Sequence, residues 1–316
     1  MNLWLAPLDG ITNYLFRNSL CRHFGGIDCF MTPFMPVQER AKLNVTNWRD
    51  IWPKHNALKP TVPQLMGNVP AHFVDTMRLL HETYGYEDFN WNIGCPVAQV
   101  VRRHRGCGLM PDTDRVEEVV AAVTSQTPFR FSIKMRLGLH SPEEGLRILE
   151  RMEPYPLDFI VVHPRLGEQM YEGTPDWDTF DEFYHLTHHR LIYSGDLNAV
   201  EDLVRLQQRY PDIQDWMLGR GILANPFLAE EIRGISCGDR KERFLKYYQH
   251  FAAELLPLRH ERGTLHNMKE LWHYWRRLFN ITDEQLRHLL RINEWEMFFD
   301  TSLQLVASGS SGIDEH

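Results

Sequence analysis

A single cysteine follows one of the apolar, strand-like runs of this sequence. Cys95 stands in NIGCP (92–96), at the end of the run 88–94. Gly94 allows the backbone to approach a bound ring closely, and Pro96 turns the chain out of the strand. A cysteine at the carboxyl end of a strand can act as an acid, a nucleophile or a ligand. A lone cysteine is more commonly a half-buried structural residue. The residues at the other strand ends must therefore decide between a structural and a functional role for Cys95.

Two glycine-containing turns follow the last two strand-like runs. They are SGD (194–196) and GRG (219–221). In α/β barrels the loops after strands seven and eight commonly bind phosphate through backbone N–H groups and a helix N-terminus. Arg220 adds a side chain able to make a charge-assisted contact. The two turns therefore favour a phosphate site, although glycine at such turns often serves backbone geometry alone.

Polar side chains also belong to the neighbouring strand ends. A lysine in a barrel mouth, as we expect for Lys134, is costly unless it meets an anion, an electron-rich ring or an acidic neighbour. The amides of Gln64 and Asn92 suit the edge of a heterocycle. His163 fits either a binding role or a hydrogen-bonded core position. A phosphate site, a lysine, amides and a thiol around one mouth together suit a flavin mononucleotide, FMN.

Short apolar runs that alternate with amphipathic, helix-length segments must position these residues. Such alternation predicts an α/β protein, with a (β/α)8 TIM barrel over residues 1–236. A doubly wound open sheet is the alternative, but no GxGxxG follows any of the runs. In the segment 141–152, Ser141 and Glu144 have the spacing of a capping box. The strand-like runs are 3–8, 29–35, 61–66, 88–94, 130–137, 157–163, 190–194 and 215–218.

After residue 236 the strand pattern gives way to helical patterns. We expect a small helical domain over 237–306, with helices at 240–256, 265–279, 282–291 and 293–305, and a disordered polar tail over 307–316. Thr282 is the expected N-cap of the third helix. The segment 239–291 has a net charge of +4, whereas the whole chain has −8. This asymmetry can mark a polyanion-binding face, although a solvated helical surface is the simpler explanation.

Composition narrows the class of protein. The chain has 316 residues, of which 43% are hydrophobic, and this suits a soluble protein with one large and one smaller domain. Five cysteines without a CxxC pair indicate neither a disulfide framework nor a metal site. We see no leader and no apolar run of about 18 residues, so we expect a cytoplasmic protein without a membrane partner. We further expect a monomer.

Several motifs in order resemble those of the tRNA-dihydrouridine synthase family, over residues 3–280. NIGCP (92–96) is similar to the family's NxGCP, which is the most specific of the set. The other similar pairs are APLDGITNYLFR (6–17) and APMxGxTDxxFR, QLMG (64–67) and QLxG, SIKMRLG (132–138) and VKxRxG, HPRLGEQMYEGTPDW (163–177) and HxRxxxQxYxGxADW, SGD (194–196) and NGD, GRGILANP (219–226) and GRGAxxNP, and HNMKELWHYW (266–275) and RKHLxWY.

The resemblance implies reduction of a tRNA uridine to 5,6-dihydrouridine, with FMN as cofactor and NADPH as reductant. It assigns to Cys95 the protonation of C5 after hydride reaches C6. A thiol with a pKa of about 8.5 is mostly protonated at pH 7 and can donate this proton. The uridine must leave the folded RNA to enter the barrel. The implied FMN contacts are Pro7, Leu8, Asp9, Gln64, Lys134, His163, Ser194, Gly195, Asp196, Gly219 and Arg220.

The tRNA is the implied partner of the barrel mouth and of the basic helical domain. The expected substrate contacts are Asn92, Arg102, Arg103, Arg105, Arg165, Tyr171, Lys269, Arg276 and Arg277. The start of the chain at the first strand and its overall length are most similar to the subfamily that modifies uridine 16.

The sequence departs from the family pattern at several positions. Ala98 and Gln99 stand where lysine is usual, and the arginines of 102–105 are candidates to replace its phosphate contacts. The other departures are RGCGLM (105–110) for GxGAxLL, Pro164 for glycine and Ser194 for asparagine.

Two other functions have to be weighed against uridine reduction. A small-molecule FMN oxidoreductase of dihydroorotate dehydrogenase type shares the barrel and an Asn-x-x-Cys-Pro loop. It leaves the motif around Tyr171 and the basic helical domain unexplained. An RNA-binding relative without turnover is the other alternative, motivated by Ala98 and Gln99. Protein free of FMN that still binds tRNA is the observation that would favour it.

Overall fold

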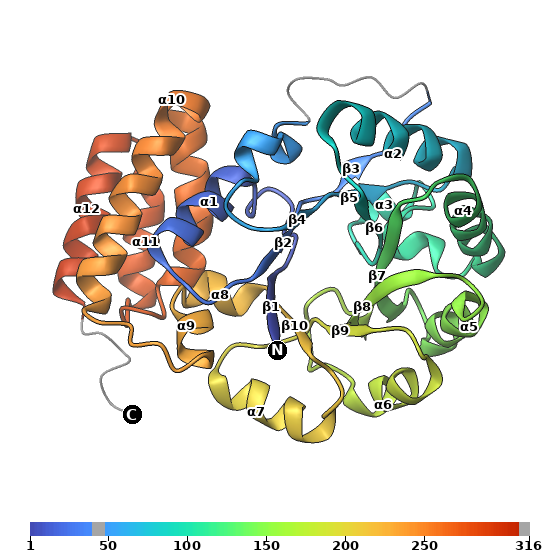
Figure 1. The fold of residues 1–316 in the computed structure, drawn as a ribbon. Coiled ribbons are helices and arrows are strands. Elements are labelled where there is room, and N and C mark those ends of the chain that lie inside the picture. Colours follow the sequence, from blue (N-terminus) through green and yellow to red (C-terminus); the bar gives the residue numbers. More distant parts are fainter. Residues whose placement is uncertain (40–47, 310–316) are drawn as a thin grey trace.

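The computed structural model describes residues 1–39 and 48–309, which form a strand ring covered by helices and, beside it, a helical domain (Figure 1). All eight expected strands are present, and two are divided. The region 29–36 contains β2 (Cys29–Met31) and β3 (Met35–Pro36), and 61–66 contains β4 (Thr61–Val62) and β5 (Gln64–Met66). The undivided strands are β1 (Asn2–Leu5), β6 (Asp88–Ile93), β7 (Arg130–Gly138), β8 (Leu157–Leu166), β9 (Leu191–Tyr193) and β10 (Asp215–Leu218).

The pairing of the divided strands closes the ring. The strand order is β3-β5-β6-β7-β8-β9-β10-β1-β2-β4, and all pairs are parallel. The two ends of this order are β3, which is half of the second expected strand, and β4, which is half of the third. These two expected strands pair with each other twice, β2 with β4 and β3 with β5, and this pairing closes the ring. The barrel prediction is therefore confirmed, and the open-sheet alternative is wrong.

Side chains that alternate along the strands divide the barrel interior into a polar and an apolar part. In the polar part Gln64 Nε2 donates to Asn90 Oδ1 (2.8 Å), and Asn90 Nδ2 donates to Ser132 Oγ (2.9 Å). Both amides are fully buried, so these bonds offset their loss of water. The apolar part consists of Trp4, Ala6, Met31, Val62, Phe159, Val161, Ile192 and Met217.

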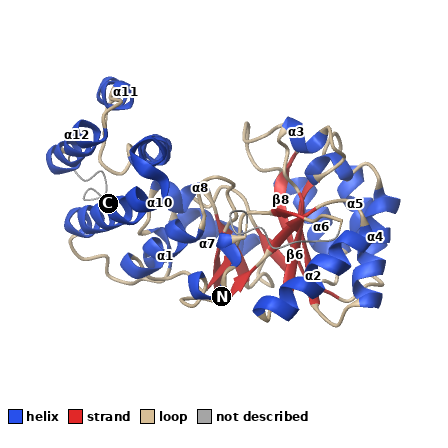
Figure 2. Ribbon diagram, turned by 90° about the horizontal axis from the view of Figure 1, so that it is seen from above, coloured by secondary structure: helices blue, strands red, loops and turns tan. Residues whose placement is uncertain are grey.

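Helices cover the outside of the ring (Figure 2). In α2 (Pro70–Tyr84) a proline occupies the first turn, and Gly85 ends the helix with φ +76°, a conformation that glycine adopts without strain. Its buried face carries Phe73, Val74, Met77 and Leu80. The other elements around the ring are α1 (Tyr14–His23), α3 (Ala98–Val101), α4 (Thr113–Gln126), α5 (Pro142–Met152), α6 (Trp177–Leu186), α7 (Val200–Arg209), α8 (Arg220–Ala224), α9 (Leu228–Ile232), and the 3-10 turns η1 (Arg49–Ile51), η2 (Pro53–His55) and η3 (Gly106–Leu109).

The capping box expected at the start of α5 is not formed. Ser141 is the N-cap residue, but its side chain makes no capping hydrogen bond. The Glu144 carboxylate instead accepts from the backbone N–H of Leu139 (2.6 Å). The Glu144 carboxylate therefore stabilises the turn between β7 and α5. Its bond with Leu139 takes the place of the bond that a capping box would make at Ser141.

The helical domain consists of α10 (Arg240–Trp275), α11 (Asp283–Arg291) and α12 (Trp295–Ser308). The first two expected helices are joined in α10, with one non-helical residue, His260, at φ 56°. The expected cap of α11 is confirmed, since Thr282 and Gln285 form a reciprocal capping box. Helix α12 continues through Ala307 and Ser308, which we had assigned to the tail, and residues 310–316 lie outside the described part of the chain.

Helix α10 joins the two units by packing on α1. Arg243 donates to both carboxylate oxygens of the buried Glu230 (2.7 and 2.8 Å) and to the His23 carbonyl (2.7 Å). Nearby, the rings of Phe16 and Phe251 meet edge to face at 6.0 Å. These contacts hold the helical domain beside the β1–α1 turn, where the barrel opens. Within the described residues no helix is long and apolar enough to span a membrane.

Candidate active site

A cleft of about 660 Å³ opens at the carboxyl ends of the strands and continues into a smaller hollow of about 80 Å³. A hollow of about 980 Å³ lies at the opposite end, around the amino ends of β9 and β10, but barrel enzymes carry their chemistry at the carboxyl ends. The cleft and the smaller hollow share Pro7, Leu8, Lys134, His163, Tyr171 and Arg220, and thus form one continuous site.

Cys95 lines the cleft just beyond the end of β6. The Asn92 Oδ1 atom accepts from the backbone N–H groups of Gly94 (3.0 Å) and Cys95 (2.9 Å), and Asn92 Nδ2 donates to Gln64 Oε1 (2.9 Å). Asn92 therefore links the turn that carries Cys95 to the hydrogen-bonded side chains inside the barrel, beginning with Gln64. Burial raises the pKa of the Cys95 thiol above its ordinary value, which keeps the proton on sulfur at neutral pH.

Gly94 lines the cleft and also makes a close contact behind it. A Cβ atom there would lie 3.2–3.3 Å from the backbone of Met135, so the glycine allows β6 to pack closely against β7. Its carbonyl accepts from Cys107 Sγ (3.0 Å) and Arg136 Nε (3.1 Å). Cys107 is fully buried and its pKa is raised by burial to about 12, so this second thiol supports the turn behind Cys95.

Lys134 and His163 form the floor shared by the cleft and the hollow. Among the described residues Lys134 Nζ has no hydrogen-bond or ion-pair partner, and burial followed by the Arg136 charge lowers its pKa to about 8. Burial and the surrounding cations lower the pKa of His163 well below 6.5, so its ring is neutral. Arg165 Nη1 lies 3.0 Å from His163 Nε2. Because arginine only donates, this nitrogen accepts and Nδ1 carries the hydrogen.

The smaller hollow is lined by the two glycine-containing turns. There Asp196 accepts from Arg165 (2.9 and 2.5 Å) and from Arg220 (2.6 Å). Although burial raises the pKa of Asp196, the bonds from the two arginines lower it below the ordinary value. The carboxylate therefore holds Arg220 in place. The expected FMN contacts that line this hollow are Pro7, Leu8, Lys134, His163, Ser194, Gly195, Asp196, Gly219 and Arg220.

Two expected contacts lie away from the cleft surface. Gln64 is fully buried behind Asn92 and lines neither the cleft nor the hollow. Arg165 is 1% exposed and also donates to the carbonyls of Glu172 (3.2 Å) and Gly173 (2.8 Å). This is not the substrate-facing position that we expected for Arg165, because every nitrogen of its guanidinium is engaged by the protein. Asp9 lines the mouth of the cleft, and its pKa is raised by burial.

Tyr171 lies where the cleft meets the hollow. Its ring is flanked by the guanidinium groups of Arg136 (5.2 Å) and Arg220 (4.9 Å), and the residue is 45% exposed. Arg136 is 2% exposed and donates to the carbonyls of Leu166 (2.9 Å) and Met170 (2.6 Å), which fixes the loop that carries Tyr171. Arg136 is a site residue that we did not assign from the sequence, although it stands two residues after Lys134 on the same strand.

Helix α10 supplies one wall of the cleft. His273 and Tyr274 line it, and we had not assigned either of them, although both lie in the HNMKELWHYW motif. Asn267 from the same helix approaches the Gly10 carbonyl (3.5 Å). Ile11, Phe34 and Met170 also belong to the apolar lining. Ile11 and Met170 lie within the quoted motifs and Phe34 within the run 29–35, but we had assigned none of them to the site.

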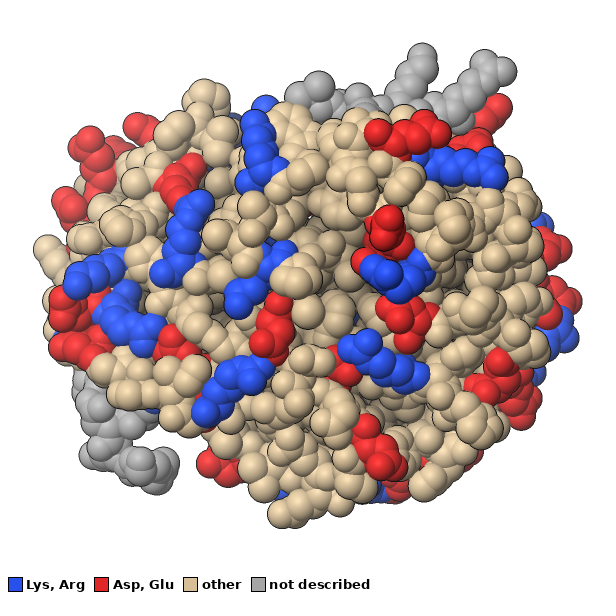
Figure 3. All heavy atoms as spheres, in the orientation of Figure 1, with Lys and Arg blue, Asp and Glu red and all other residues tan. Residues whose placement is uncertain are grey.

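The remaining basic residues that we expected to contact RNA lie outside the cleft lining. Arg102 and Arg103 are exposed after α3, and Arg105 is half-buried. In the helical domain Arg276 pairs with Asp283 (2.5 Å), Lys269 donates to Asn293 Oδ1 (3.1 Å), and Arg277 is exposed. Figure 3 shows Lys and Arg side chains spread over the helical domain with acidic side chains between them.

The sequence matches the family model described as dihydrouridine synthase over residues 4–299. The chain belongs to the dihydrouridine synthase family. The family prediction is thus confirmed over nearly the whole chain. A probable tRNA-dihydrouridine synthase of Rhizobium leguminosarum bv. phaseoli is 26% identical over 272 residues, covering 83% of each protein.

Other members of the family are similar at the same level. A tRNA-dihydrouridine(16) synthase of Aquipseudomonas alcaligenes is 26% identical, covering 77% of this chain and 78% of that protein. A tRNA-dihydrouridine(47) synthase-like protein of Xenopus tropicalis is 27% identical, covering 73% and 36%. Sequence identity therefore does not separate the two positional types.

Solved structures with the same fold are more distant. A morphinone reductase mutant in complex with tetrahydroNAD superimposes with a TM-score of 0.51 at 12% identity, covering 74% of this chain and 87% of that one. A variant of NCR from Zymomonas mobilis gives 0.51 at 11%, covering 74% and 86%. At these identities the likeness concerns the barrel alone.

Proposed function

We propose that this dihydrouridine synthase reduces a uridine of tRNA to 5,6-dihydrouridine, with FMN as its cofactor and NADPH as its reductant. The observation that carries the proposal is a protonated thiol, Cys95, held by Asn92 over a cleft whose floor contains Lys134, which has no partner within residues 1–39 and 48–309. Family membership supplies the reaction class. The name of the Xenopus relative includes NAD(P)(+), which supports a nicotinamide reductant.

The shape and charge of the site fit a mononucleotide flavin. The long cleft suits the ring system, and the adjoining small hollow, bordered by Gly195, Gly219 and Arg220, suits one phosphate group. The absence of any partner for Lys134 among the described residues fits an amine that meets an anionic or electron-rich group on the bound flavin. When bound, FMN supplies the hydride.

Cys95 would complete the reduction by giving its proton to C5 of the uracil ring. Hydride addition to C6 leaves negative charge delocalised over C5 and the adjacent carbonyl, so a proton donor must stand next to C5. The raised pKa of Cys95 keeps the thiol loaded with its proton at pH 7. Neutral His163, with its hydrogen on Nδ1, lies on the floor without adding a charge of its own.

The tRNA would reach this site with its uridine extruded from the stacked bases. Residues 237–306 would serve as the RNA-binding domain and 1–236 as the FMN-binding domain. Tyr274 and His273 form a wall of the cleft from α10, so RNA bound to the helical domain would lie next to the mouth. We propose that the active unit is a monomer.

The test is nucleoside mass spectrometry of unmodified tRNA after incubation with purified protein, FMN and NADPH. A gain of two hydrogens on uridine is the expected result, and fragment mapping reports the position, for which we expect 16. NADPH oxidation stimulated by pyrimidine acids without any tRNA product would instead favour the dihydroorotate dehydrogenase type. tRNA binding by protein that holds no FMN would favour a relative without turnover.

A further inference from the structure

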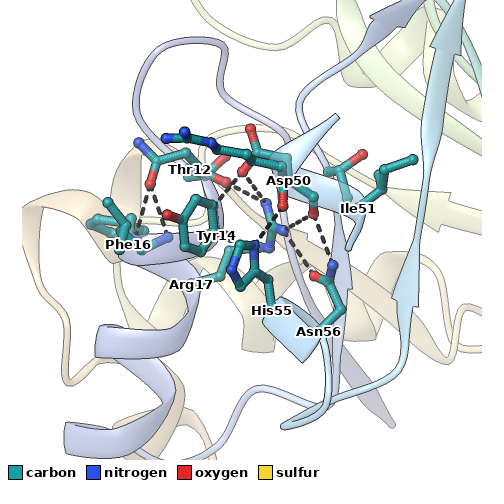
Figure 4. Close-up of polar contacts among 12 residues, drawn as sticks. Thr12, Tyr14, Phe16, Arg17, Asp50, Ile51, His55 and Asn56 are labelled. Carbon is teal, nitrogen blue, oxygen red and sulfur yellow. Dashed lines mark hydrogen bonds and ion pairs between the residues drawn. The ribbon is translucent and has the colours of Figure 1, made fainter. Parts of the chain in front are cut away.

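Three aromatic side chains form a stack beside the mouth of the cleft. Tyr14 and His55 lie nearly parallel, with ring centroids 3.9 Å apart and an interplanar angle of 5°, as Figure 4 shows. Trp52 stacks on His55 at 5.2 Å and 28°. All three residues are partly exposed, so ring faces or edges remain open to solvent. We call Tyr14, Trp52 and His55 the aromatic ledge.

The ledge adjoins the site through the β1–α1 turn. Tyr14 is the first residue of α1, and Asp9 and Ile11 in the preceding turn line the cleft. Asp50, whose carboxylate accepts from the Tyr14 backbone N–H (2.5 Å), is also close enough to Asp9 to raise its pKa further. The ledge therefore lies next to the turn that lines the cleft, although its three residues are not part of the cleft lining.

A buried arginine holds the two segments of the ledge together. Arg17, whose side chain is fully buried, donates to the carbonyls of Thr12 (2.9 Å) and Asp50 (2.7 Å) and to Asn56 Oδ1 (2.9 Å). The Asn56 amide in turn donates to the Asp50 carbonyl (2.9 Å), and these contacts appear together in Figure 4. Because such a network is costly to break, it holds α1 against the turns that carry Trp52 and His55.

Basic side chains lie around the ledge, together with two acidic ones. Lys54 Nζ lies 4.7 Å from the Trp52 ring, and the charges of Arg49 and Arg259 act on the Tyr14 hydroxyl, as do those of Asp50 and Glu254 with the opposite sign. Among residues 1–39 and 48–309, none of these three cations forms an ion pair with an acidic side chain. His55 itself is neutral at pH 7, because burial lowers its pKa. Flat rings bordered by free cations match the faces and phosphates of a single-stranded polynucleotide.

We propose that the aromatic ledge stacks an unpaired nucleobase of the tRNA that neighbours the uridine in the cleft. Extrusion of a base from folded RNA exposes the faces of its neighbours, and an aromatic platform replaces the stacking that they lose. The inference rests on the proposed function, since it takes the RNA substrate from there. It assigns to the ledge affinity for the RNA, with no part in the transfer of hydride or proton.

The test compares tRNA binding by His55→Ala and Tyr14→Ala with that of the wild type, using the dissociation constant from filter binding. Each variant should weaken binding about tenfold, which is a typical loss for one stacked base. FMN content and NADPH oxidation should stay unchanged, as should the turnover number at saturating tRNA. His55→Phe should bind nearly as well as the wild type, because it keeps the flat ring.

The chain offers a matched control at the other end of the barrel. Tyr184 and His185 are also a tyrosine and a histidine in contact, beside the amino ends of the strands, but their rings meet edge to face, with centroids 5.1 Å apart and an interplanar angle of 64°. Tyr184→Ala and His185→Ala should leave tRNA binding unchanged. Wild-type affinity in His55→Ala, or equal losses in His55→Phe and His55→Ala, would overturn the ledge as a stacking platform. If the wild type binds tRNA but forms no dihydrouridine, the proposed reaction fails while the ledge is still decided by the binding series.

Discussion

The barrel mouth and the helical domain are both rich in basic residues, but they use them differently. At the mouth Arg17, Arg136 and Arg165 are at most 2% exposed, and their guanidinium groups donate to backbone carbonyls or to side chains of the wall. In the helical domain Arg259 and Arg277 are exposed and make no ion pair with a described residue. The first group positions loops, and the second remains available to a polyanion.

This difference also changes how the charge of the helical domain is understood. The net charge of +4 over 239–291 treats all basic residues alike. Several of them are in fact neutralised by acidic partners: the ion pairs are Arg240 with Glu231, Arg243 with Glu230, Lys246 with Glu242 and Arg276 with Asp283. Burial and pairing, more than charge count, therefore separate groups that hold the protein from groups that meet a ligand.

Two thiols at the mouth, the half-buried Cys95 and the buried Cys107, give the sharpest test of the separation between groups that meet a ligand and groups that hold the protein. Cys95→Ala should lower the rate of uridine reduction about 10²- to 10⁴-fold, because the proton donor is lost, while FMN content and tRNA affinity stay unchanged. Cys107→Ala is the control, since this thiol faces the Gly94 carbonyl, and it should keep most of the activity. Single-turnover measurement of dihydrouridine gives both rates. An unchanged yield in Cys95→Ala would rule out this thiol as the acid.

The same donor predicts a pH dependence. As the proposed donor, Cys95 would act only while it holds its proton, and its pKa lies above the ordinary value. The rate of uridine reduction should therefore stay level through neutral pH and decline only as the pH rises through this raised pKa. Single-turnover rates across the alkaline range measure the effect, and a decline already on the acidic side of neutrality would contradict it.

Arg165 tests the buried, positioning class. Arg165→Met should lower the free energy of unfolding by about 3 kcal/mol, because Asp196 and the carbonyls of Glu172 and Gly173 lose their partner. Arg209→Met removes a similar two-pronged contact, to Asp181, but at the surface, and should cost about 0–1 kcal/mol. Urea unfolding of both variants measures the difference. Equal losses would break the distinction between the two classes of arginine.

Lys134 tests a half-buried basic group at the cleft that has no partner in the described part of the chain. Its pKa in the folded protein is about 8, below the ordinary 10.5, so the folded state resists carrying the charge. Stability of the flavin-free protein should therefore rise between about pH 8 and pH 10.5, where the unfolded chain binds more protons. Lys134→Met should stabilise the flavin-free protein by about 3 kcal/mol at pH 7 and abolish this rise, yet weaken FMN binding. Thermal unfolding against pH and flavin titration give the two readouts.

Lys269, a half-buried residue of the helical domain that donates to Asn293 Oδ1, tests RNA binding by that domain and should show the smallest effect. Lys269→Glu should weaken tRNA binding a few-fold and reduce its salt dependence, because one phosphate contact is lost. Reduction of the flavin by NADPH should not change. Arg115→Glu on α4, which lies across the barrel from the helical domain, is the control and should bind tRNA like the wild type (Figure 1). If Lys269→Glu keeps full affinity, the helical domain does not bind the RNA as proposed.

Much of the scaffold was predictable because the signals for it are local. Alternating strand and helix patterns marked all eight strands, and they placed the Cys95 turn at a carboxyl end, where the structure has it. The division of two strands was not predicted, because it depends on pairing between segments: β2 pairs with β4, whereas β3 pairs with β5. The capping box at Ser141 failed for a similar reason, since Glu144 bonds to Leu139 instead.

The amino-acid sequence by itself determined the barrel, the family and the thiol at the mouth, because periodicity and motif spacing are properties of the chain. Contacts between distant segments determined the rest of the site. Arg165 meets Asp196 across 31 residues, and Tyr274 reaches the cleft only because α10 packs on α1. An arginine that holds a wall and an arginine that meets RNA look alike in a sequence. They differ in burial, which arises only when remote segments remove the side chain from water.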